Sequence, residues 1–200
     1  MIKNVITVLL ASFLIVGVAN ASDKNWKTSE HNFNIESGDW GLQVRTYGND
    51  DYDHVEVSNK VADNVTVALR IAEDGANTEY RPKLTHKIFA DGPISLAHRI
   101  EYRYFEGNTT DDYWRYRGIV KLSSDNLWLT LQPRWTFGGD KKNDTKIDDV
   151  KWQAGYDWVL SESADSKVVF TPFVEYLQNG ESNDWTKQHL IAGTTLKVKF

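Results

Sequence analysis

The feature that most constrains the fold is an alternation of apolar and polar residues with a period of two. In the final segment, HLIAGTTLKVKF, one face carries Leu190, Ala192, Thr194, Leu196, Val198 and Phe200. The opposite face carries His189, Gly193, Thr195, Lys197 and Lys199. A period of two is that of a β-strand with one apolar and one polar side. The segment is therefore predicted to be a strand.

The same alternation recurs upstream and brings the total to about ten strands. The upstream segments begin near Trp40, Val55, Val65, Tyr80, Ile94, Trp114, Leu127, Val150 and Val168. Long polar connections such as EGNTTDD alternate with mostly shorter ones such as SSDN. These features are typical of bacterial outer-membrane barrels, which have an even number of strands. We expect an all-β fold, an antiparallel transmembrane β-barrel of about ten strands, with twelve possible.

The first residues predict export. Lys3 precedes the apolar run VITVLLASFLIVGV, and the ANA that ends at Ala21 has the form of a cleavage site. The predicted organisation is a signal peptide over residues 1–21, an N-terminal extension or first strand over 22–38, and the transmembrane barrel over 39–200. The expected location is the bacterial outer membrane.

Other classes are less compatible with the composition. The chain has no cysteine, which excludes disulfides, thiolate metal sites and a cysteine nucleophile. After the signal, no apolar run approaches the roughly 18 residues of a membrane helix. A soluble β-sandwich also alternates, but its outward face is polar and its strands are shorter. Long strands, a signal peptide and a terminal aromatic residue favour the membrane barrel.

If the apolar face meets lipid, the complementary positions line the lumen. By this parity about sixteen basic residues face inward against about five acidic ones. The acidic ones are Asp39, Glu56, Glu101, Asp157 and Glu175. The whole chain has a formal net charge of -5, so its acidic residues lie mostly in loops and its interior is basic. A narrow channel focuses the potential of its lining charges, which predicts an anion-selective pore.

The candidate substrate-binding residues form a basic track along the pore. They are Arg45, Arg70, Arg81, Lys83, Arg99, Arg103, Arg115, Arg117, Lys121, Arg134, Lys151, Lys187 and Lys197. A guanidinium fork can hold a carboxylate through two hydrogen bonds, and many such sites in series could pass an anion along. The alternative is that these side chains are structural, pair with the inward acids, and nearly close a small barrel.

Four stretches carry a resemblance to a known family: DWGLQVRTYGNDDYDHVEVSNKVADNVTVALRIAED, HRIEYRYFE, FTPFVEY and GTTLKVKF. Over about residues 39–200 the chain resembles the oligogalacturonate-specific porins of the KdgM type, a family that includes the NanC sialic acid channel. The resemblance implies a monomeric outer-membrane barrel with a narrow lumen and arginine and lysine tracks that admit acidic sugars. The positions that would correspond to these tracks are notably Arg45, Arg70, Arg99, Arg103, Arg115, Arg117 and Arg134.

The resemblance also implies twelve strands, more than the alternation yields unless residues 22–38 supply some of the difference. A narrower pore would restrict the size of the solute. The partners we expect are the lipid bilayer and lipopolysaccharide, with acidic sugars or other small anions as solutes and no nucleic acid. The function we expect is passive uptake of such solutes, with no cofactor and no reaction.

The sequence gives little support for a catalytic site or a metal site. His86 and His98 fall on the lipid face by parity, and His189 faces inward without an evident serine and carboxylate partner. NDDYDH and GGDKKNDTKIDD contain oxygen ligands but lack the spacing of an EF-hand loop. Two alternatives to a channel remain: a closed structural or adhesive barrel, and a hydrolase at the rim centred on His189.

Overall fold

The computed structural model describes residues 26–48, 52–74, 77–107, 111–138, 147–179 and 188–200. Within these ranges the chain forms strands joined by turns, and it has no helix long and apolar enough to cross a membrane. The strands are β1 (Trp26–Ser37), β2 (Trp40–Tyr47), β3 (Tyr52–Ala62), β4 (Val65–Asp74), β5 (Asn77–Asp91), β6 (Ile94–Glu106), β7 (Tyr113–Ser124), β8 (Leu127–Phe137), β9 (Asp149–Tyr156), β10 (Trp158–Glu162), β11 (Lys167–Asn179) and β12 (Gln188–Lys199).

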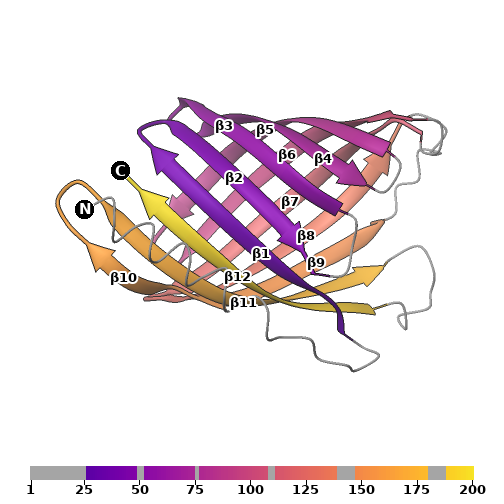
Figure 1. The fold of residues 1–200 in the computed structure, drawn as a ribbon. Coiled ribbons are helices and arrows are strands. Elements are labelled where there is room, and N and C mark those ends of the chain that lie inside the picture. The colour runs from indigo at the N-terminus through magenta and orange to yellow at the C-terminus, as the bar shows by residue number, and fades with distance from the viewer. Residues whose placement is uncertain (1–25, 49–51, 75–76, 108–110, 139–146, 180–187) are drawn as a thin grey trace.

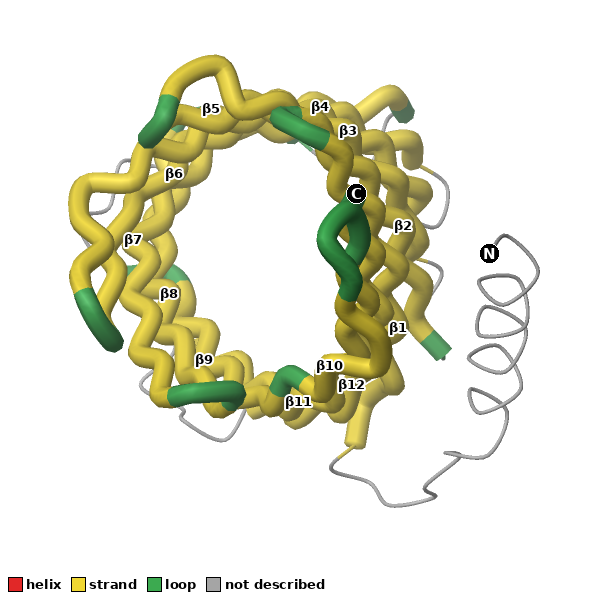
Figure 2. Tube along the Cα trace, turned by 90° about the vertical axis from the view of Figure 1, so that its left-hand side faces the viewer, coloured by secondary structure: helices red, strands yellow, loops and turns green. Residues whose placement is uncertain are grey.

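The strands form one closed barrel (Figures 1 and 2). Neighbours in sequence pair antiparallel from β1 to β9, β9 pairs with β11, and β12 pairs with both β11 and β1. Eleven strands therefore close the barrel, and β10 is an extra strand that pairs with β11 alone. The prediction of an all-β barrel is confirmed.

The described residues form twelve strands, the higher of the two numbers expected from the sequence, but the barrel closes in a different way. Strand β1 lies within residues 22–38, and it pairs in parallel with β12, for example Phe33 with Leu196. The closure is therefore mixed rather than wholly antiparallel, with an odd number of strands round the barrel. Alternation missed β1 because its outward positions include the polar His31 beside Phe33 and Ile35, so neither face is strictly apolar.

A second difference concerns the expected single strand from Val150 to Leu160, which the structure breaks at Asp157 into β9 and β10. The break lies beside Pro172, where pairing of β11 passes from β9 to β10. Proline has no N–H to donate to a neighbouring strand, so the ladder is interrupted there. Asp157 fills the gap by accepting hydrogen bonds from Trp128 Nε1 at 3.1 Å and Thr171 Oγ1 at 2.7 Å.

Tight hairpin turns define one rim of the barrel. The rim that carries Phe200 has short turns, two residues long in the β1–β2, β3–β4, β5–β6 and β7–β8 hairpins. Gly38 and Gly92 have positive φ angles of 56° and 53°, which L side chains rarely adopt, so glycine suits these tight turns.

The pattern of side-chain burial is the reverse of that in a soluble protein. Large apolar side chains such as Trp40 and Leu69 point outward and are 62% and 46% exposed. Charged side chains such as Glu79, Arg81 and Glu101 are buried. Since successive side chains of a strand point to opposite faces, this pattern places a polar interior inside an apolar outer wall. The interior of the barrel is thus the place to look for a functional site.

Candidate functional site

The lumen contains a network of ion pairs that spans most of the barrel. Its carboxylates are Glu30, Glu56, Glu79, Glu101, Asp149 and Glu175. The cations around them are Arg45, Arg70, Arg81, Lys83, Arg99, Arg103, Arg115, Arg117, Arg134 and Lys151. Ten cations therefore share six carboxylates, which leaves a positive surplus in this described part of the lumen.

Glu79 on β5 is the most completely coordinated carboxylate. It is 0% exposed and accepts hydrogen bonds from Arg103 Nε and Nη2, each at 2.7 Å. Arg81 donates to the same two oxygens, with Nη2 at 2.7 Å from Oε2. Two guanidinium forks on one carboxylate give strong, directional pairing. The Arg103 guanidinium also lies 4.9 Å from the centre of the Phe105 ring, which adds a cation–π contact.

Glu101 on β6 is the second buried centre and is shared by three arginines. Arg117 donates Nη2 to Oε1 at 2.7 Å, while Arg81 and Arg115 have Nη1 atoms at 3.9 and 3.8 Å from the same oxygen. Arg115 also donates Nη2 to the Tyr113 hydroxyl at 3.0 Å. Glu101 therefore accepts one close fork and lies between two more distant cations.

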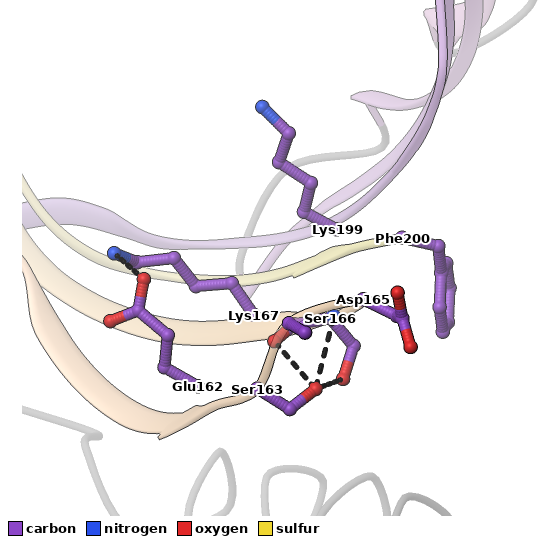
Figure 3. Close-up of a pocket in the computed structure, with 8 residues that line it drawn as sticks. Glu162, Ser163, Asp165, Ser166, Lys167, Lys199 and Phe200 are labelled. Atoms are coloured by element: carbon purple, nitrogen blue, oxygen red, sulfur yellow. Dashed lines mark hydrogen bonds and ion pairs between the residues drawn. The ribbon is translucent and has the colours of Figure 1, made fainter.

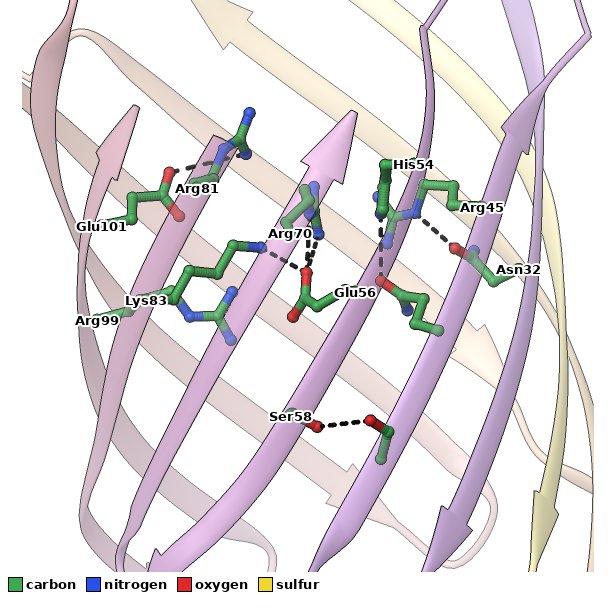
Figure 4. A network of polar contacts seen from close by, with 12 residues as sticks. Asn32, Arg45, His54, Glu56, Ser58, Arg70, Arg81, Lys83, Arg99 and Glu101 are labelled. Atoms are coloured by element: carbon green, nitrogen blue, oxygen red, sulfur yellow. Dashed lines mark hydrogen bonds and ion pairs between the residues drawn. The ribbon is translucent and has the colours of Figure 1, made fainter. Parts of the chain in front are cut away.

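A third centre lies at Glu56 on β3 (Figure 4). Its Oε2 accepts hydrogen bonds from Arg70 Nε at 2.8 Å and Lys83 Nζ at 2.6 Å. Figure 4 also shows Arg99 near Lys83, and its Nε donates to Thr85 Oγ1 at 2.8 Å. Among the described carboxylates, none forms an ion pair with Arg99.

Strands β4 to β8 therefore form a cationic wall, and the rest of the lumen differs from it. On β1 and β2, Glu30 pairs with Arg45 at 3.2 Å, and Arg45 Nε also donates to Asn32. On β9 and β11, Glu175 pairs with Lys151 and accepts a hydrogen bond from Gln153 at 2.8 Å. Acidic and basic groups are nearly balanced on this side. The lumen is consequently electrically asymmetric.

The remaining predicted track residues lie nearer the Phe200 rim or outside the described ranges. Lys121 lies 5.6 Å above the Trp128 ring, and Lys197 pairs with Glu36 at 3.0 Å. Lys187 lies outside the described residues. The other predicted positions belong to the network above, so the structure brings most of the predicted track together inside the barrel.

A shallow cavity of about 590 Å³ lies at the Phe200 rim, away from this network (Figure 3). The β10–β11 turn and the end of β12 line it. Its Lys167 is paired with Glu162 at 2.9 Å, and Ser163 and Ser166 hydrogen-bond each other across the turn. The cavity combines both signs of charge in an exposed turn, so it offers no concentrated anion site.

Three lumenal carboxylates were missed by the sequence reading. Glu30 lies on the strand that alternation did not detect, and Asp149 directly precedes Val150, where the eighth predicted segment begins. Glu79 lies one residue before the outward Tyr80, so strict parity on β5 could have found it. Conversely, Asp39 lies in the exposed β1–β2 turn rather than in the lumen. The carboxylates consequently neutralise more of the positive charge of the interior than the sequence suggested.

The histidines do not assemble a catalytic group in the described part of the chain. His86 and His98 lie on the outer face, where their Nδ1 and Nε2 atoms are 3.0 Å apart. The side chain of His189 lies outside the described residues. Among the residues that the structure describes, no three potential metal ligands gather. Parts of NDDYDH and GGDKKNDTKIDD also lie outside the described ranges.

Comparison with known proteins adds no assignment. No protein-family model matches the chain, and no curated protein matches it significantly.

Proposed function

We propose that the protein is an outer-membrane channel for the passive uptake of small acidic solutes, in particular acidic mono- or oligosaccharides. The observation that carries the proposal is the surplus of cations over carboxylates on strands β4 to β8. Charges in a narrow passage with low-dielectric walls attract ions of opposite sign and repel those of like sign. The lumen would therefore favour anions although the whole chain is acidic.

The outer wall supports a membrane location. Apolar side chains that are 37–62% exposed in the isolated barrel cover its outside, where water would leave them unfavourably solvated. An apolar band outside and polar groups inside is the arrangement of transmembrane barrels. The resemblance to the KdgM-type porins agrees with this proposal and suggests a monomer that passes oligogalacturonate or sialic acid.

Galacturonate and galactose provide a matched pair of solutes, because they differ by one carboxylate. In a liposome-swelling assay at fixed ionic strength, we expect vesicles that contain the protein to admit galacturonate faster than galactose. Empty vesicles provide the baseline. Equal rates for the two sugars would contradict the selectivity, and a rate equal to that of empty vesicles would contradict a channel.

A closed barrel with a structural role is the second candidate. The side chains of Glu79 and Glu101 are 0% exposed and that of Arg81 is 4% exposed, so these three groups are shielded from solvent by their neighbours. In that case the ion pairs would serve as a structural core. The absence of any protein-dependent swelling would favour this candidate.

A further inference from the structure

Three arginines occupy directly opposite positions on adjacent strands of the cationic wall. Arg99 on β6 pairs in register with Arg117 on β7, and Arg117 pairs with Arg134 on β8. All three project inward, and Arg117 and Arg134 are buried. Neighbouring strands lie about 4.8 Å apart, and like charges directly opposite one another destabilise a sheet. We call these residues the arginine row.

The described carboxylates do not fully compensate the positive charge of the arginine row. Arg117 is paired with Glu101, and Arg134 Nε lies 3.2 Å from Asp149 Oδ1. Arg99 forms its described side-chain hydrogen bond with the neutral Thr85 and has no described carboxylate partner. Glu101 is moreover shared with Arg81 and Arg115. The row thus keeps at least one positive charge without a described carboxylate at ion-pair distance.

Hydrogen-bond donors without an acceptor lie beside this charge. Arg134 Nε makes no hydrogen bond in the described structure, although Asp149 Oδ1, which also lacks a hydrogen-bond partner, lies 3.2 Å away. Arg115, next to Arg117 along β7, has a buried Nε that also lacks a hydrogen-bond partner. Buried polar donors normally find an acceptor, and charged ones left unpaired are costly. An anionic acceptor near the row would satisfy both the charge and the donors.

We propose that Arg99, Arg117 and Arg134, with Arg115 beside them, form a discrete binding station for one oxyanion, the carboxylate of a solute in the lumen. Planar guanidinium groups on three adjacent strands can surround such a group with several charge-assisted hydrogen bonds. The inference deepens the proposed function and rests on it, because the station is where a passing acid would pause. The other lumenal arginines mainly bind the protein's own carboxylates.

Arg99 provides the cleanest test, because R99Q leaves no buried carboxylate without its partner. The matched control is R70Q on the same wall: it removes one lumenal charge, while Glu56 keeps Lys83 as a partner. Galacturonate is titrated into the purified barrel in detergent, with binding followed by calorimetry at constant ionic strength and galactose as the neutral reference. Circular dichroism confirms that each variant retains its strands.

Wild-type protein is expected to bind galacturonate and not galactose. R99Q should weaken galacturonate binding about ten- to hundredfold, the effect of losing charge-assisted hydrogen bonds, and R70Q should weaken it much less. Equal weakening in both variants would indicate that a diffuse positive potential, rather than a discrete binding station, attracts the solute. That result would overturn the proposal. Absence of wild-type binding in a barrel that still admits galacturonate preferentially would overturn the station alone. Failure of that preferential uptake would instead reject the proposed function.

Discussion

Arg103 holds Glu79 through two parallel hydrogen bonds, Nε to Oε1 and Nη2 to Oε2, both at 2.7 Å. The pair joins β6 to β5 in the lumen, and Arg81 binds the same carboxylate from β5. Within the barrel, such ion pairs occupy the place that apolar packing has in a soluble protein. The stability of the barrel therefore depends on side chains that, under the proposed function, also line the path of the solute.

The first prediction concerns this carboxylate. E79Q should destabilise the barrel by about 3–5 kcal/mol, because the buried Arg81 and the partly buried Arg103 lose their charged partner. E162Q is the control, since Glu162 pairs with Lys167 at an exposed turn where the effect should stay below about 1 kcal/mol. Urea unfolding in lipid vesicles, followed by tryptophan fluorescence, measures both. Equal stability of the two variants would show that the Glu79 cluster is not a structural core.

The outer wall gives a second prediction. Leu69 lies outward in the middle of β4, and L69R should destabilise the vesicle-embedded barrel by about 2–4 kcal/mol if this surface meets lipid. The same substitution on a water-facing surface would change stability by only about 0.5 kcal/mol. D111R in the exposed β6–β7 connection is the control. Unfolding from vesicles distinguishes the two cases, and a negligible effect of L69R would contradict the membrane location.

The parallel closure gives a third prediction. His31 on β1 lies opposite Thr194 on β12, and their side chains hydrogen-bond at 3.0 Å. Because the chain has no native cysteine, the double variant H31C/T194C should form one disulfide on mild oxidation. H31C/V198C, displaced four residues along β12, should not form it. A gel shift on oxidation reads out both, and the reverse pattern would rule out this register.

Much of the fold could be predicted from the sequence, because alternation depends only on the pleat of a strand. Segments with a clear apolar face, such as those around Trp114 and Val168, were predicted as strands and correspond to β7 and β11. Strand β1 lies in the segment 22–38 that was predicted as an extension or first strand, and alternation alone did not detect it because His31 interrupts its outward face. The break at Asp157 depends on Pro172, a residue on the neighbouring strand. Closure between β1 and β12 likewise depends on long-range pairing that no local pattern encodes.

The sequence predicted which kind of residue lines the lumen, but not how far the carboxylates there neutralise the cations. Parity identified inward arginines such as Arg117, but the degree to which glutamates neutralise them depends on cross-strand register. Arg99 and Arg103 illustrate this, because they lie on one strand and face the same lumen. Arg103 is held by Glu79, whereas Arg99 has only Thr85 as its described polar partner. Only the three-dimensional arrangement separates the cations paired with carboxylates from those, like Arg99, that have no described carboxylate partner.

The most direct test of the central claim is the reversal potential of single channels in a planar bilayer under a potassium chloride gradient. A cation surplus on β4 to β8 predicts a reversal potential whose sign indicates preferential chloride passage, and R99Q should reduce it. A reversal potential at zero, or one that indicates potassium preference, would contradict an anion-selective lumen.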